Sequence, residues 1–513
     1  MQASSDTPTE VRSAGASGVR LLLLAEGPTV FAVATACYLA AGAFLAIGHN
    51  LLEGDAVSRV GNAYWILYSR DPHLAAIGFV WNPLPSLAML PVLLFKSVWP
   101  DLARIGFASN IVSAPFMAGM VYQANRFLRE SGVPGRARLL LTVLLAAHPL
   151  ILYHGANGLS EAPALFFLVF AIRYLARWLR AGELSGLVVA GIGLGTAYLV
   201  RYEAAIAAAA AFAVVAMVSF TRDSRGLRAR VTTAFCDLVI AASPFALTFA
   251  YWTAASWIIT GQPFGQLQSV YGNSSQLRYF HSGGGPTAIH VFTSSGLPAH
   301  LLNSTVGQVL LRAVILQPVL PLGVPVVLLS LLLRRDWATL AAPAILGAPL
   351  AFAVVAAAMG SIGPENRYFI WGVPLGFLMM AEAIPRQSVP GQAGSSAVGI
   401  PAEKIPVQRA AGALCVLGVL LLLLPSLPIS GWLMLDSKLS YGADALRLVL
   451  DGRGRTTEYT TDRAIAAYVD RLHLGPGTVL VDVFTGFPIV LASRNPRQFV
   501  ITSDRDFNIV LAN

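Results

Sequence analysis

The sequence predicts an all-α polytopic membrane protein. Hydrophobic residues make up 56% of the 513 residues and charged residues 12%, whereas a typical soluble domain has roughly 25% charged residues. Several apolar runs approach or exceed the ~20 residues that a helix needs to cross the hydrocarbon core. The net charge of +9 lies largely in short loops between these runs. Positive-inside topology therefore explains it more simply than a nucleic-acid partner does.

The N-terminal part of the chain predicts an anchor followed by a polar loop. Residues 1–18 are polar and are expected to form a cytoplasmic tail. The first apolar run, at about residues 28–47, is too long for the core of a cleavable signal peptide. The loop at residues 48–82 carries too many charges for lipid and several aromatic residues that favour headgroups. We expect this loop to lie in water or along the membrane surface.

The remaining apolar runs are expected to complete a transmembrane domain over residues 19–435. They lie at about residues 83–95, 102–122, 139–153, 162–174, 187–200, 204–220, 234–259, 306–333, 337–359, 369–383 and 410–433. Arginine-rich segments fall on one side if every run after residue 139 crosses once, and that side is predicted to be cytoplasmic. The charges require an odd number of crossings between Asn82 and Arg126, which contain two runs. Either the run at 83–95 does not cross fully or the charge rule misleads there; we expect eleven to thirteen spans.

Two segments near the C-terminus differ from the spans. Residues 385–408 are rich in Pro, Gly and Ser and predict a flexible cytoplasmic linker. Residues 436–513 contain a helical pattern at 461–472 and strand-like runs at 478–484 and 498–502. This order predicts a small α/β domain outside the membrane. The sequence stops in what resembles the middle of a helix, so we expect a piece of a longer chain.

The three cysteines, Cys37, Cys236 and Cys415, each lie inside an apolar run. This placement implies no disulfide framework. We expect buried thiols in packed helices.

Two carboxylates at the external ends of spans are candidate catalytic residues. Asp55, in EGDAVSR, is placed to accept a proton from an attacking hydroxyl; alternatively it pairs with Arg59, one helical turn further on. Glu161, in HGANGLSEAP, stands at the mouth of a span with His154 and Asn157 near it. It also fits the first turn of the next helix, where the helix dipole favours negative charge. The two roles of Glu161 are compatible.

Two arginines on the same face predict a phosphate-binding function. Arg201 precedes Tyr202 and Glu203 at an external hairpin, and Arg367 precedes Tyr368 before a later span. The guanidinium fork donates two parallel hydrogen bonds to a phosphate. These residues therefore suggest a phosphorylated lipid headgroup. The alternatives are interfacial snorkelling or an internal ion pair, such as Arg201 with Glu203.

The external loop at residues 261–304 is long and contains a Gly-Gly-Gly run with Tyr279 and His281 close by. Its length suits a mobile lid, and a plain connector is the alternative. Its glycines do not match a phosphate-cradling P-loop, and no His or Cys cluster has the spacing of zinc ligands. Asp55, Asp71 and Glu161 could hold Mg²⁺ or Mn²⁺, although no residue is assigned as a metal ligand.

These motifs together resemble the GT-C superfamily of membrane glycosyltransferases, which includes protein O-mannosyltransferases, aminoarabinose transferases, GPI mannosyltransferases and mycobacterial arabinofuranosyltransferases. The resemblance covers residues 28–383 and rests on the order and sidedness of its motifs. They are Asp55 in GDAVSR, Asn82-Pro-Leu-Pro, Glu161 in NGLSEAP, RYEA at 201–204, WIITGQPF at 257–264 and ENRYFIWGVPL at 365–375. Two departures stand out. Asp55 lacks the adjacent second acid of many members, and Asn82 replaces a lysine that some members carry.

The resemblance implies a sugar donor on a polyprenyl phosphate and a glycan, lipid or protein acceptor, with transfer on the outer face of the membrane. The predominance of arginine over lysine and the abundant alanine suggest a GC-rich bacterial genome, so we expect a bacterial plasma membrane. Asp55 would activate the acceptor hydroxyl in one inverting displacement, with Glu161 as the second catalytic acid. Arg367, Arg201 and Tyr368 would bind the lipid phosphate. The expected substrate-binding residues are His154, Asn157, Glu53, Arg59, Tyr279 and His281.

Two other functions remain open. Intramembrane arginines and carboxylates also serve a transporter or flippase of a lipid-linked or anionic solute. Transporters usually show internal repeats, and no clear self-similarity relates the halves of this sequence. The third possibility is a non-catalytic GT-C-like binding protein, which would tolerate loss of Asp55.

Overall fold

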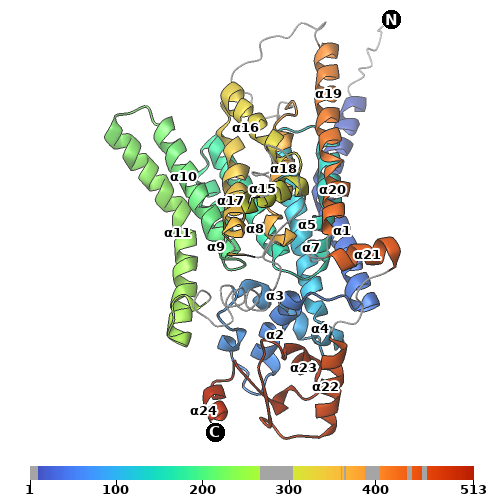
Figure 1. Cartoon of the computed structure of the whole chain (residues 1–513). Coiled ribbons are helices and arrows are strands. Elements are labelled where there is room, and N and C mark those ends of the chain that lie inside the picture. Colours follow the sequence, from blue (N-terminus) through green and yellow to red (C-terminus); the bar gives the residue numbers. More distant parts are fainter. Residues whose placement is uncertain are drawn as a thin grey trace, which may run out of the picture.

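The computed structural model of the chain describes residues 10–265, 304–359, 361–362, 365–386, 405–435, 442–452 and 459–512, without the side chains of residues 10–25, 305 and 405–410. Within this part the fold is a bundle of helices with one small sheet (Figure 1). This confirms the predicted class of a helical polytopic membrane protein in its coarse form.

The helices of the first half are α1 (Glu10–Ala43), α2 (Gly54–Tyr68), α3 (Leu84–Leu93), α4 (Asp101–Arg104), α5 (Phe107–Glu130), α6 (Gly135–Ala147), α7 (Pro149–Ala156), α8 (Glu161–Ala181), α9 (Leu184–Tyr198), α10 (Ala204–Arg222) and α11 (Leu227–Thr260). Those of the second half are α15 (Thr305–Leu316), α16 (Leu320–Arg334), α17 (Ala348–Ala358), η5 (Asn366–Phe369), α18 (Gly372–Ala381), α19 (Ile405–Leu423), α20 (Ser426–Met434), α21 (Ala443–Asp451), α22 (Thr460–Arg471), α23 (Phe487–Ala492) and α24 (Phe507–Ala512). In the bundle, α5 packs between α1 and α8, and α9 packs between α8 and α11.

In the described part, six helices are long and apolar enough to cross a membrane. They cover Glu26–Gly48, Glu161–Ala181, Ala204–Arg222, Leu227–Thr260, Trp337–Ala358 and Ala411–Met434. Two bent pairs, α6 with α7 at 61° and α15 with α16 at 75°, raise the number to eight if each pair is one span. The expected eleven to thirteen spans are therefore not confirmed. Several apolar runs, such as those that form α9 and α18, make helices of only 15 and 10 residues.

Helix α3 bears on the unresolved parity of the first spans. It has 10 residues, which at 1.5 Å per residue extend about 15 Å, half of a hydrocarbon core. Helix α3 packs against α2 and α5 and is too short to cross the bundle by itself. This favours the alternative in which the run at 83–95 does not cross fully.

The arginine-rich segments meet at one end of the bundle, which we call the arginine-rich end. Arg138 pairs with Glu26 across α6 and α1. Asp336 pairs with Arg180 at 3.5 Å and also with Arg386. At the opposite end lie α2, α3, α22, α23 and α24 (Figure 1); we call this the α2 end. The predicted grouping of charged loops is thus present, while the assignment of one end to the cytoplasm stays a prediction.

Residues 459–512, here called the C-terminal unit, contain the elements expected from the sequence. Helix α22 precedes two parallel three-residue strands, β1 (Val479–Val481) and β2 (Phe499–Ile501), with α23 between them. The apolar side chains of this unit share one buried cluster with α2, α3, α4 and α5. An independent α/β domain is therefore not established, and it stays a prediction.

The cysteines differ from the expectation in one respect. Cys37, Cys236 and Cys415 are free thiols, as predicted, but all three are exposed on the helix surfaces rather than buried. An apolar run does not show which of its faces packs against another helix and which faces outward. The prediction of buried thiols was therefore wrong.

Candidate functional site

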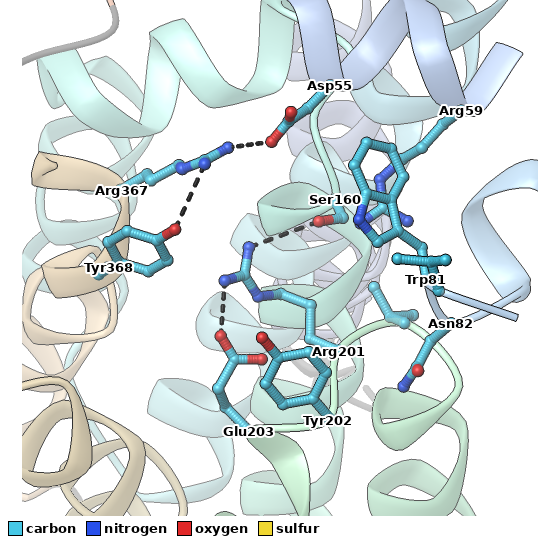
Figure 2. Close-up of a pocket in the computed structure, with 12 residues that line it drawn as sticks. Asp55, Arg59, Trp81, Asn82, Ser160, Arg201, Tyr202, Glu203, Arg367 and Tyr368 are labelled. Atoms are coloured by element: carbon cyan, nitrogen blue, oxygen red, sulfur yellow. Dashed lines mark hydrogen bonds and ion pairs between the residues drawn. The ribbon is translucent and has the colours of Figure 1, made fainter. Parts of the chain in front are cut away.

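A polar pocket of about 90 Å³ lies at the α2 end. Its residues come from α2, the segment before α3, the turns before α8 and α10, and η5, and many of their side chains point toward one another (Figure 2). The lining residues are Asp55, Arg59, Val80, Trp81, Asn82, Ser160, Val200, Arg201, Tyr202, Glu203, Arg367 and Tyr368. Segments as far apart in the sequence as Asp55 and Arg367, which are separated by 312 positions, thus form one site.

The loop before α3 is fixed to the end of α9. The backbone N–H of Leu84 donates to the carbonyl oxygen of Leu199 at 3.0 Å, and the Asn82 amide donates to the carbonyl of Tyr198. These bonds hold Trp81 and Asn82 beside the hairpin that carries Arg201.

Gly158 lies in the turn that connects α7 to Glu161 at the start of α8. Its φ of +81° is left-handed, and a Cβ there would lie 2.1 Å from Ser109 Oγ. Glycine is favoured in both respects, since it has no Cβ. The tight turn it permits ends α7 and lets α8 begin at Glu161.

Arg201 is held between two carboxylates. Its Nη1 lies 2.5 Å from Glu161 and its Nη2 lies 2.6 Å from Glu203. The Glu161 side chain has no exposed surface, and that of Arg201 is 11% exposed. Burial by itself lowers the pKa of Arg201, but Glu203 and Glu161 more than offset this and raise it overall. Arg201 therefore carries a permanent charge that its two neighbours already balance. This confirms both the predicted pair with Glu203 and the predicted place of Glu161 in the first turn of a helix.

Arg367 binds two carboxylates and a tyrosine hydroxyl. Its guanidinium pairs with Asp55, its Nε lies 2.5 Å from Glu365, and its Nη2 lies 3.4 Å from the Tyr368 hydroxyl. The Asp55 side chain is 39% exposed, and so it is the pocket carboxylate most open to a reactant. The alternative that Asp55 pairs with Arg59 is wrong, since Arg367, 312 positions away, takes that place.

Arg59 differs from the other two arginines of the pocket. Its guanidinium stacks over the Trp81 ring at 4.4 Å (Figure 2). Its Nε and Nη1 are buried and have no hydrogen-bond partner among the described residues. Burial lowers the pKa of Arg59 to about 10, which still leaves it charged at neutral pH. A buried cation with unused donors suits an anionic ligand.

Glu53 lies behind the pocket, where it accepts a hydrogen bond from the Tyr153 hydroxyl. Burial raises the pKa of this carboxyl well above its ordinary range, although Arg367 opposes the shift. Burial likewise raises the pKa of Glu365. Burial thus raises the pKa of two carboxyl groups near Arg367.

The structure gathers some of the predicted site residues and separates others. Asp55, Arg59, Arg201, Arg367 and Tyr368 line the pocket, and Glu161 contacts it through Arg201. Glu53, His154 and Asn157 do not line it. His154 lies 3.9 Å from Glu161, and Asn157 accepts a bond from the Leu159 N–H, which caps the local turn. Tyr279 and His281 lie outside the described residues.

Seven further pocket residues were not assigned to the site from the sequence: Val80, Trp81, Asn82, Ser160, Val200, Tyr202 and Glu203. Glu365, which pairs with Arg367, was also missed. Glu203 and Glu365 could have been found from the sequence, because each lies two positions from an arginine that was assigned to the site. The role of Trp81 depends on a fold contact that no local pattern reveals.

The described residues contain no group of three or more His, Cys, Asp or Glu side chains that could hold a metal ion. Asp71, considered as a ligand, receives hydrogen bonds from Arg505 instead. A divalent cation remains a prediction, and no step below uses one.

No protein-family model matches this chain, and a comparison with curated proteins finds no relative. The geometry of the pocket is therefore the main indication of function.

Proposed function

We propose that this protein is a membrane glycosyltransferase of GT-C type that moves a sugar from a polyprenyl phosphate to an acceptor hydroxyl at the α2 end. The observation that carries the proposal is the pocket itself. It combines one accessible carboxylate, Asp55, with three arginines in a polar site at the end of a membrane bundle. A base and a set of cations are what displacement of a phosphate by a hydroxyl requires.

The proposed step is a single displacement. Asp55 takes the proton of the acceptor hydroxyl while the acceptor oxygen forms a bond to the anomeric carbon. The bond from that carbon to the phosphate oxygen breaks, and its electron pair leaves with the lipid phosphate. Negative charge thus grows on the phosphate, and fixed cations that face it stabilise the transition state.

We assign a different role to each of the three arginines. Arg59 has unused donors and is the best placed to receive the phosphate. Arg367 orients Asp55 through their ion pair, and it also donates to the Tyr368 hydroxyl. Arg201, balanced by Glu161 and Glu203, holds the hairpin in place. Glu161 is fully buried, so we assign it to holding Arg201 rather than to proton transfer.

The arginine-rich end favours the enzyme over a transporter. Glu130 there bonds both Arg173 and Arg177 at 2.6 Å, and Asp336 and Glu382 both pair with Arg386. A transporter must open this end to release its solute, which would break several partly buried ion pairs. An enzyme that works at one face needs no such opening.

Transfer of radiolabel from polyprenyl-phosphate sugars, tested with arabinose and mannose donors first, decides the function. We expect purified wild type to transfer label and Asp55→Asn to transfer none, because the amide cannot accept the proton. Asp101→Asn is the matched control, since Asp101 pairs with Arg104 outside the pocket. Full activity in Asp55→Asn would remove Asp55 from the mechanism. Absence of transfer from every donor, with donor binding intact, would favour a transporter or a binding protein.

A further inference from the structure

Helix α2 carries two of the pocket residues, Asp55 and Arg59, yet its own support is limited. It has 15 residues and lies outside the helices that qualify as spans. A helix of this length is marginal in water unless it packs against other elements. One side of α2 packs on α3, α4 and α5. The position of Asp55 therefore also depends on what covers the other side.

The C-terminal unit supplies that cover. Helix α23 contacts α2, and Phe487 and Phe499 of the unit share one buried apolar cluster with Tyr64 and Trp65 of α2. The unit also reaches the first turn of α2, where a Cβ on Gly54 would lie 3.0 Å from the Tyr459 hydroxyl of the unit. Contacts thus extend from the first turn of α2 to its last.

A charged clamp joins the two elements just beyond the end of α2. Arg70 and Asp71 face Asp504, Arg505 and Asp506, so that opposite charges meet throughout. The Arg70 guanidinium donates to Asp504 at 3.1 Å and pairs with Asp506 as well. Arg505 donates to Asp71 from its side chain at 2.9 Å and from its backbone N–H at 3.1 Å.

The two halves of this clamp differ in burial. The Asp504 side chain is 1% exposed, whereas that of Arg505 is 72% exposed. Exposed ion pairs contribute little, because water screens them. A buried carboxylate depends strongly on its partner. The pair of Arg70 with Asp504 is therefore the half that fixes the unit to α2.

We propose that the C-terminal unit is a positioning element for the pocket, and that Arg70 and Asp504 clamp it to α2 so that Asp55 stays opposite Arg367. Arg70 is thus a positioning residue, remote from the reacting atoms. The inference concerns the placement of α2 and does not depend on sugar transfer. A helix transmits a displacement at one end to the other, so release of Arg70 would shift Asp55 in the first turn.

The experiment uses the full chain in detergent with three variants. Arg70→Ala leaves the buried Asp504 carboxylate without its arginine partner. Arg70→Ala/Asp504→Asn removes both charges and so separates the loss of the clamp from a stranded carboxylate. Arg505→Ala is the matched control, because it removes the exposed pair on the same surface. Each variant is measured by thermal unfolding and by hydrogen exchange of the amides of residues 54–68.

We expect Arg70→Ala to lower the unfolding midpoint and the double variant to restore most of it. The double variant should still exchange the α2 amides at least about tenfold faster than wild type, because the clamp is absent. Arg505→Ala should match wild type in both measurements. Wild-type exchange in the folded double variant would overturn the inference.

Enzymatic activity is a second measurement, and the hydrogen-exchange result does not depend on it. If a donor is found, the double variant should both lower kcat and raise the KM for donor, since α2 carries Asp55 and Arg59 together, whereas Arg505→Ala should leave both constants unchanged. If no donor reacts, the proposed function fails, and the exchange rates still decide whether the unit holds α2.

Discussion

Replacement of Arg201 by alanine is expected to destabilise the folded protein by about 3–5 kcal/mol, the usual cost of removing one partner from a buried ion pair. The figure applies here because Glu161 is fully buried and Arg201 is 11% exposed. Loss of the guanidinium would remove the partner that lies 2.5 Å from Glu161 and leave His154 beside it at 3.9 Å. Glu203, with a side chain 11% exposed, would lose its partner too.

The assay is thermal unfolding of purified protein in detergent, with four variants compared under one condition. Arg201→Ala should unfold well below wild type, and Arg201→Lys should lie between them, because one ammonium cannot bridge two carboxylates as the planar fork does. Glu161→Gln should be mild, since Arg201 keeps Glu203. Arg201→Ala/Glu161→Gln should recover at least half of the loss, because the buried charge is gone.

The double variant decides the interpretation. If Arg201→Ala is as stable as wild type, Arg201 does not hold Glu161 as described, and a role for Arg201 as a free phosphate ligand becomes the better explanation. If the double variant is no more stable than Arg201→Ala, the loss comes from packing and the buried charge is not its cause.

Two further changes test the surroundings of the pocket. A carboxyl whose pKa is raised on folding stabilises the protein at low pH and loses that contribution as pH rises above its ordinary value of 4.5. Wild type should therefore lose up to about 1.4 kcal/mol per pH unit for each such proton. Glu53→Gln, which still accepts a hydrogen bond from Tyr153, should flatten the fall of the unfolding midpoint as pH rises above 4.5. An unchanged slope would show that Glu53 does not titrate in this way. Gly158→Ala should cost more than Gly182→Ala by about 1–3 kcal/mol, because both glycines have positive φ but only Gly158 would place a Cβ against Ser109. Equal midpoints for these two variants would contradict the described turn.

Much of the fold follows from composition and charge placement. Long apolar runs predict a helical membrane bundle, and the arginine-rich loops do meet at one end of it. The number of spans could not be predicted, because an apolar run does not reveal where a helix breaks. The bend of 61° between α6 and α7 occurs at His148 and Pro149, within one continuous apolar run. The side of each helix that packs is equally hidden, as the exposed cysteines show.

The members of the site were more predictable than their partners. Asp55, Arg201 and Arg367 were placed on one face from the order of spans, and the pocket contains all three. The pair of Arg201 with Glu203 was also expected, since the two are neighbours in the sequence. The partner of Asp55 was not, because a local rule favours the residue one turn away. The fold instead brings Arg367 to Asp55 and occupies Arg59 with Trp81.

These partners lead to a last prediction, which separates two arginines by their effect on kinetics. In an inverting displacement the base and the leaving group lie on opposite faces of the sugar. Arg367 is bonded directly to Asp55, so it belongs on the face of the base, whereas Arg59 stacks on Trp81 and keeps two donors without a partner among the described residues. Loss of Arg59 should therefore weaken the hold on the donor phosphate, and loss of Arg367 should misplace the base.

Once a donor is identified, Arg59→Ala should raise the KM for donor by tenfold or more, because a charged hydrogen bond contributes about 1.5–3 kcal/mol. Arg367→Gln should lower kcat with a smaller change in KM. Trp81→Phe serves as the control for Arg59, since it keeps an aromatic face under the guanidinium. The reverse pattern, with the KM effect at Arg367 and the kcat effect at Arg59, would place the phosphate beside Asp55. A single inverting displacement with Asp55 as its base would then be excluded, because the base and the leaving group would share one face.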